Sequence, residues 1–160
     1  MKLATNTPLD KLLDGGIETD AITNIYGPAG SGKTNIAIST ALANEKKTVY
    51  IDTEGSFSLE RFMQLGGTEK KLKKIIFIEI TSWGEQHEKV LNLSSALDGV
   101  GLVIIDSIVT LYRLELSNDN FQHINRQLAT QYSALSRICR KLGMPVLVTN
   151  QVYSVGDNIE

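Results

Sequence analysis

Short runs of β-branched and aliphatic residues recur along the chain and alternate with segments of helical periodicity. The runs that predict buried strands cover residues 21–26, 48–52, 75–80, 102–106 and 146–150. The longest helical segment between them spans residues 121–142, and Gly143 and Pro145 end it. This alternation predicts an α/β fold, in which helices cover both faces of a doubly wound parallel sheet of about five strands.

A glycine-rich loop follows the first of these strands. Its sequence, Gly27-Pro28-Ala29-Gly30-Ser31-Gly32-Lys33-Thr34, fits G-x-x-x-x-G-K-[ST]. Glycines let the backbone N–H groups turn toward an anion, Lys33 brings positive charge to the β- and γ-phosphates, and the Thr34 hydroxyl can ligate Mg²⁺. The helix expected over 35–43 directs its positive end to the same place. The motif predicts a P-loop that binds nucleotide phosphates, and the alternative is a plain turn between two core elements.

Three polar side chains stand at the carboxyl ends of other predicted strands. Asp106 ends an apolar strand and is placed to hold Mg²⁺ directly or through water. Glu54 could orient the water that attacks a γ-phosphate, and its alternative role is that of a surface turn residue. Gln151 offers an uncharged amide that could sense the γ-phosphate. Because ligands of such sheets bind beyond the carboxyl ends of the strands, we expect the three to converge on the glycine-rich loop.

Composition narrows the class of protein further. The 160 residues are 42% hydrophobic and 21% charged, as in an ordinary globular domain. No apolar run is long enough to span a membrane and no signal-peptide pattern begins the chain, so we expect a cytoplasmic protein without a membrane partner. The formal net charge of −2 excludes a strongly basic nucleic-acid binder, so any DNA contact must come from a local patch, a partner or an assembly.

Two further groups of residues have simple interpretations. The lysines at 70, 71, 73 and 74 predict a solvated helix face, with phosphate binding as the alternative. Cys139 lies within the pattern of the long helix, which predicts a small packing residue. His87 and His123 have no neighbour at ligand spacing, which argues against a zinc site.

Several blocks together resemble the core of RecA-family recombinases. These blocks are residues 9–18, 26–34, 50–55, 104–107, 111–113 and 148–152. They cover nearly the whole chain, and Thr149-Asn150-Gln151-Val152 is similar to the archaeal and eukaryotic branch of the family. The resemblance implies a RecA-like P-loop NTPase with ATP as ligand and Mg²⁺ as cofactor. It also implies Glu54 as catalytic carboxylate together with Lys33, and Asp106 as Walker B residue. By the same resemblance, Gln151 is the γ-phosphate sensor before a DNA-binding loop, and Arg61 stacks on adenine.

Departures from the family pattern shape the expected function. The chain has no Phe-x-x-Ala polymerisation motif, and residues 114–120, which match the first DNA-binding loop, hold two acids and no base. We therefore expect an accessory paralogue of recombination and repair that hydrolyses ATP weakly. Its expected partners are single-stranded DNA, bound weakly, and the main recombinase, with self-association left open. The alternatives are a RecA-fold ATPase of the KaiC type that acts on proteins, and a regulatory scaffold that binds nucleotide without hydrolysis.

The end of the sequence carries one more expectation. Only residues 152–160 follow Gln151, whereas the resemblance implies further strands beside the phosphate-loop strand. We therefore expect residues 1–160 to be a single RecA-like ATPase core domain that is C-terminally short. In that form, residues 22–26 lie at an open sheet edge and stability is reduced.

Overall fold

The structure, a computed structural model, describes residues 1–155 and 158–159, with side chains for residues 1–153. Residues 156, 157 and 160 belong to the segment after Gln151, where we expected a DNA-binding loop, and they lie outside the described residues. In chain order the elements are β1 (Lys2–Leu3), α1 (Leu9–Leu12), β2 (Ile17–Glu18), β3 (Ile22–Gly27), α2 (Lys33–Ala43), β4 (Lys47–Asp52), α3 (Leu59–Gln64), α4 (Glu69–Leu72), β5 (Ile75–Glu79), α5 (Trp83–Asn92), the 3₁₀ turn η1 (Leu93–Ala96), β6 (Val100–Asp106), α6 (Thr110–Glu115), α7 (Phe121–Leu142), β7 (Val146–Gln151), β8 (Ser154–Val155) and β9 (Asn158–Ile159).

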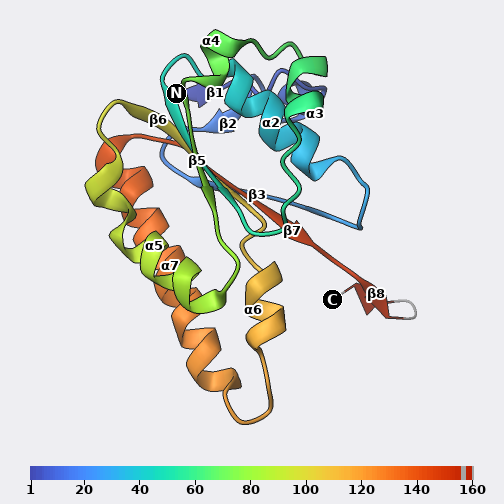
Figure 1. Cartoon of the computed structure of the whole chain (residues 1–160), viewed down its shortest axis with the longest axis vertical. Coiled ribbons are helices and arrows are strands. Elements are labelled where there is room, and N and C mark those ends of the chain that lie inside the picture. The colour runs from blue at the N-terminus through green and yellow to red at the C-terminus, as the bar shows by residue number, and fades with distance from the viewer. Residues whose placement is uncertain (156–157, 160) are drawn as a thin grey trace.

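Five parallel strands form the central sheet, in the order β3-β7-β6-β4-β5. Helices α2, α3 and α4 cover one face, and α5 and α7 cover the other (Figure 1). The predicted parallel α/β architecture is therefore confirmed. Among the described strands, β3 lies at one end of this order and β5 at the other.

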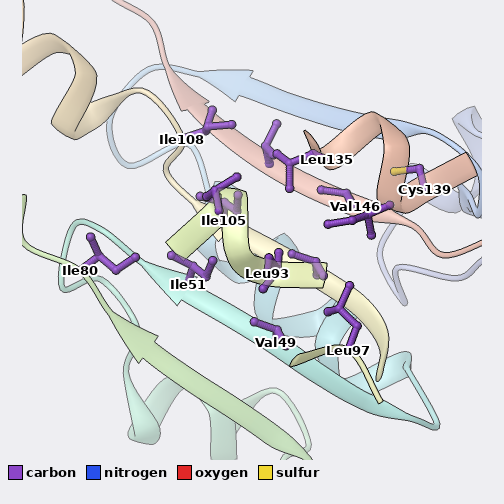
Figure 2. Close-up of a cluster of buried hydrophobic side chains, with 14 of the residues drawn as sticks. Val49, Ile51, Ile80, Leu93, Leu97, Ile105, Ile108, Leu135, Cys139 and Val146 are labelled. Carbon is purple, nitrogen blue, oxygen red and sulfur yellow. The ribbon is translucent and has the colours of Figure 1, made fainter. Parts of the chain in front are cut away.

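Alternation along the central strands explains why both faces are covered. In β4, Tyr50 packs with α2, whereas Val49 and Ile51 on either side of it pack toward α5 and α7. Strands β6 and β7 alternate in the same way, because successive side chains of a strand point to opposite faces. Figure 2 shows the larger cluster, in which Leu93 of η1 and Leu135 and Cys139 of α7 join residues of the strands.

Helix α7 has the predicted bounds. Its buried face includes Ile124, Leu135 and Cys139, and it ends at Gly143, whose φ of 57° is left-handed. Burial raises the pKa of the Cys139 thiol. This residue is therefore a packing residue, as predicted. Within the described residues no helix combines the length and the hydropathy needed to cross a membrane.

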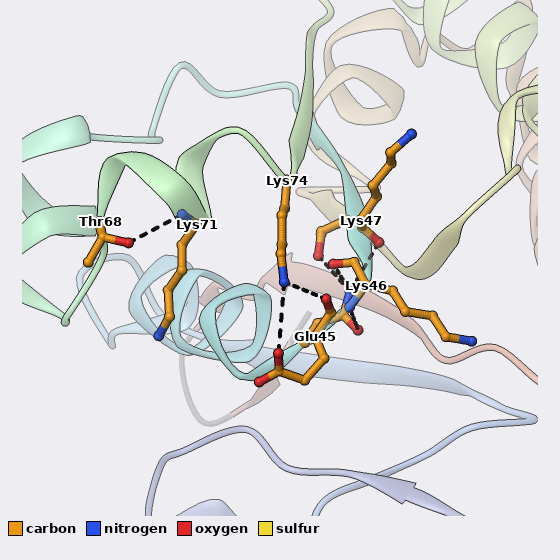
Figure 3. Close-up of polar contacts among 8 residues, drawn as sticks. Glu45, Lys46, Lys47, Thr68, Lys71 and Lys74 are labelled. Carbon is orange, nitrogen blue, oxygen red and sulfur yellow. Dashed lines mark hydrogen bonds and ion pairs between the residues drawn. The ribbon is translucent and has the colours of Figure 1, made fainter.

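The lysine cluster lies at the amino ends of the strands, on and after α4. Lys73 pairs with Glu69 at 2.9 Å. The Lys74 ammonium donates to the carbonyl oxygen of Glu45 at 2.7 Å (Figure 3). Because β5 begins at Ile75 and the glycine-rich loop follows the carboxyl end of β3, the cluster and the loop lie at opposite ends of the sheet. This separation favours the interpretation of the lysines as a solvated helix face over a role in binding phosphate at the glycine-rich loop.

Candidate nucleotide-binding site

The glycine-rich loop, residues 27–34, connects β3 to α2. Gly30 and Gly32 have φ values of 73° and 91°, in the left-handed region that favours glycine. A Cβ atom at either position would meet no atom within 4 Å. The backbone conformation therefore requires glycine there, and the space beside the loop is open to a ligand. The first N–H groups of α2 have no partner within the helix, so they can donate to an anion.

Lys33, the first residue of α2, folds back over this loop. Its ammonium donates to the carbonyl oxygens of Gly27 at 3.1 Å and Pro28 at 2.8 Å, and lies 3.4 Å from Ser31 Oγ. All three acceptors are neutral, and no carboxylate of the described residues forms an ion pair with Lys33. Its positive charge therefore stays available for a phosphate group.

Thr34 and Asp106, the two predicted Mg²⁺ ligands, are brought together by a third residue. The Thr34 hydroxyl donates to Ser56 Oγ at 3.4 Å, and the Ser56 hydroxyl donates to Asp106 Oδ2 at 3.3 Å. Among the described residues, no group of three or more His, Cys, Asp or Glu side chains could hold a metal. One hydroxyl and one carboxylate beside a phosphate loop nevertheless suit Mg²⁺, which takes its other ligands from water and substrate phosphates. The residues present therefore fit a magnesium ion.

Two buried hydroxyl groups hold the Asp106 carboxylate in place through hydrogen bonds. Tyr50 Oη donates to Oδ2 at 2.9 Å and Thr149 Oγ1 donates to Oδ1 at 2.5 Å, while Asp106 itself is 1% exposed. Burial and the negative charge of Asp106 raise the pKa of the Tyr50 phenol well above its usual value. The phenol therefore remains a proton donor to the carboxylate.

Asp52, at the end of β4, shapes the loop that carries Glu54. Its carboxylate accepts the backbone N–H groups of Glu54 at 3.0 Å, Ser56 at 3.2 Å and Phe57 at 3.0 Å. In the same loop, Thr53 Oγ1 donates to the carbonyl oxygen of Ser107 at 2.6 Å. Sequence reasoning did not assign a role to Asp52, although an Asp directly before a glycine-containing turn is a known signal for such backbone bonds.

Glu54 is exposed and anchored to the neighbouring connection. Its Oε1 accepts a hydrogen bond from Thr110 Oγ1, at the start of α6, and this hydroxyl also lies 3.2 Å from Ser107 Oγ. The described hydrogen bonds of Glu54 involve Asp52 and Thr110 and no residue of the glycine-rich loop. Glu54 thus lies at the expected edge of the sheet, and its catalytic role stays a prediction.

Gln151 and Arg61 complete the predicted set. Gln151 pairs with Gly27 in the β3–β7 ladder, and its carbonyl oxygen accepts from Arg113 Nη1 at 2.5 Å. The guanidinium of Arg113 in turn lies 5.0 Å from the ring centre of Tyr153. Arg61 is exposed on α3, where its backbone N–H donates to Ser58 Oγ, so its contact with adenine stays a prediction.

Sequence comparison decides the family. The family model described as Rad51 matches residues 1–159. The chain belongs to the Rad51 family. Members of the Rad51/RecA family are typically ATPases that bind ATP with Mg²⁺. The recombination proteins of this family act on DNA and with a recombinase. The five-stranded parallel sheet agrees with this RecA-like core.

Curated relatives carry the name DNA repair and recombination protein RadB. The protein from Methanococcus maripaludis (strain C7) is 48% identical over 160 residues, covering 95% of this chain and 74% of the relative. The protein from Methanosphaera stadtmanae is 42% identical over 164 residues, covering 98% and 70%. That from Methanothermobacter thermautotrophicus is 39% identical over 167 residues, with the same two shares. The chain is thus similar to archaeal members of the Rad51 family.

Proposed function

We propose that the chain is an accessory protein of homologous recombination and DNA repair that binds ATP and hydrolyses it slowly. Family membership supports the role in recombination, and so do archaeal relatives named DNA repair and recombination protein RadB. The observation that carries the ATP site is the approach of Thr34 and Asp106 through Ser56, directly beside the glycine-rich loop. A plain glycine-rich turn has no need of this arrangement.

In this proposal, the glycine-rich loop and Lys33 bind the phosphates of ATP. The open N–H groups at the start of α2 donate to phosphate oxygens, and the Lys33 ammonium leaves its carbonyl acceptors for them. Thr34 and Asp106 hold Mg²⁺, which when bound neutralises charge on the phosphate oxygens. Arg61 stacks on the adenine ring.

Glu54 acts as general base in the same proposal. Its carboxylate takes a proton from water as the water oxygen bonds to the γ-phosphorus, and the bond to the bridging oxygen breaks to release ADP. Thr110 donates to the same carboxylate and competes with the water for it, which supports slow turnover. Gln151 senses the γ-phosphate, and the bond from Arg113 to its carbonyl oxygen links it to α6.

DNA and the main recombinase are the proposed partners. Residues 114–120, after the start of α6, contain Glu115 and Asp119 and no basic residue, so their own attraction for phosphate is weak. The charge pattern supports weak binding to single-stranded DNA, and in this proposal the main recombinase strengthens it.

Phosphate release and DNA binding measured on one preparation test the proposal. We expect slow release of phosphate that requires Mg²⁺, and weak binding to single-stranded DNA that decreases as salt increases. The Lys33→Ala variant is the control for contaminating ATPases. Absence of Mg²⁺-dependent ATP binding would refute the nucleotide site, and absence of DNA binding at low salt, alone and with the recombinase, would refute the role on DNA.

A further inference from the structure

Ser56 lies between the two residues that would hold magnesium. Its hydroxyl is 3.4 Å from Thr34 Oγ1 and 3.3 Å from Asp106 Oδ2. Both distances are long for hydrogen bonds between oxygen atoms, whose usual separation is about 2.7–2.8 Å. Ser56 Oγ therefore lies within reach of both oxygens and makes a tight hydrogen bond to neither.

The position of Ser56 is imposed by the surrounding loop. Asp52 Oδ1 accepts the Ser56 N–H at 3.2 Å, and Asp52 Oδ2 accepts the N–H of Phe57. The Phe57 ring packs edge-on against Tyr50, with ring centres 5.2 Å apart. The loop is thus fixed by a buried carboxylate on one side and by an aromatic contact on the other, so the Ser56 hydroxyl is presented to Thr34 by a defined backbone.

The three hydroxyl donors to Asp106 differ in their access to a ligand. Tyr50 and Thr149 are fully buried, whereas Ser56 is only partly buried and also contacts Thr34. Within the described residues, the bond from Ser56 is therefore the one that a ligand beside Thr34 can replace. Mg²⁺ usually keeps several of its waters, and each such water has two protons to donate.

We propose that Ser56 is a positioning residue of the magnesium site, whose hydroxyl hydrogen-bonds a water ligand of the metal between Thr34 and Asp106. This inference rests on the proposed ATP-binding function. In the bound state the water donates to Ser56 Oγ and to Asp106 Oδ2, and the direct Ser56–Asp106 bond is given up. Because Asp52 holds the N–H groups of both Ser56 and Glu54, the same contact orders the segment that carries the proposed general base.

The test measures how much Mg²⁺ is needed for binding of a fluorescent ATP analogue. For Ser56→Ala we expect the Mg²⁺ concentration at half-maximal binding to rise about fivefold, the effect of one lost hydrogen bond. Binding of the same analogue in EDTA stays unchanged, and Ser56→Thr, which keeps the hydroxyl, restores the wild-type value. If Ser56 only supports the loop, we expect neither the unchanged binding in EDTA nor the restoration by Ser56→Thr.

Ser58→Ala is the matched control. Ser58 lies two residues further on, and its hydroxyl caps α3 by accepting the Arg61 N–H at 3.2 Å. This variant should lose thermal stability and leave the Mg²⁺ requirement unchanged. An unchanged Mg²⁺ requirement in Ser56→Ala, an equal loss of binding in EDTA, or an equal shift in Ser58→Ala would each overturn the inference while the ATP site stands. If the wild-type chain binds no ATP analogue with Mg²⁺, the proposed function fails instead.

Discussion

The Tyr50 hydroxyl donates a hydrogen bond of 2.9 Å to Asp106 Oδ2. Tyr50 comes from β4 and Asp106 from β6, and these strands pair so that Asp52 stands opposite Asp106. The phenol lies in the core beneath α2, and its raised pKa, caused first by burial and then by the charge of Asp106, keeps it protonated. The core on that side of the sheet thus holds the carboxylate that is proposed to serve the metal.

Removing this phenol should therefore destabilise the fold. For Tyr50→Phe we expect a loss of about 1.5–3 kcal/mol in the free energy of unfolding, because a buried carboxylate loses a donor. The measurement is urea denaturation followed by circular dichroism. Tyr132→Phe is the control, since the Tyr132 hydroxyl forms no hydrogen bond within the described part of the chain, and its change should stay below about 0.5 kcal/mol. Equal stability of both variants would contradict the role of Tyr50.

Replacing Lys33 should abolish nucleotide binding without unfolding the protein. The ammonium bonds only to neutral oxygens of its own loop, so Lys33→Ala removes little from the folded state. ATP affinity measured by calorimetry should fall at least about tenfold, as expected for a lost charge-assisted contact. Lys73→Ala, an exposed change directly after α4, should bind ATP as the wild type does. A folded Lys33→Ala variant with full affinity would refute the phosphate-loop interpretation.

Replacing Glu54 should separate binding from turnover. Glu54→Gln keeps the size of the side chain and removes the basic carboxylate, so phosphate release should fall about 100-fold or more while the affinity for ATP with Mg²⁺ is retained. Glu60→Gln, an exposed change on α3, should leave both unchanged. If Glu54→Gln releases phosphate at the wild-type rate, Glu54 is not the base.

Asp10 should make stability depend on pH near the amino terminus. Slight burial alone would raise its pKa, but hydrogen bonds from Thr5 and Asn6 outweigh it and lower the pKa below the usual value. A lowered pKa in the folded state means that the stabilisation is complete above the unfolded pKa of about 4 and is lost as the pH falls through the folded value.

Asp10→Asn should therefore melt at a lower temperature than the wild type at pH 7. The difference should shrink in melts recorded at decreasing pH, because the wild type loses the same bonds on protonation. Asp98→Asn, an exposed change before β6, is the control and should melt as the wild type does at each pH. A constant difference between Asp10→Asn and the wild type at every pH would contradict the assignment.

Local sequence signals were sufficient for the fold and for the position of Asp106 near the glycine-rich loop. Runs of β-branched residues gave the five strands, and strand ends gave Asp106, because both signals lie within a few neighbouring residues. Ser56 and Thr149 were missed, since their contacts with Asp106 span 50 and 43 residues and depend on the register of separate strands. Tyr50 was missed for a related reason. Its pattern predicts a core residue, which it is, and only the side-chain geometry shows that its hydroxyl reaches the site.

Strand β3 carries the glycine-rich loop and lies at the border of the sheet, with β7 as its only ladder neighbour among the described strands. On its other side β3 pairs with no described strand, whereas β6 is paired on both sides. Amide hydrogens of β3 should exchange with deuterium long before those of β6. A nucleotide bound to the loop should reduce the local opening of this edge strand. Its binding can therefore be measured as slower exchange of the amide hydrogens of β3.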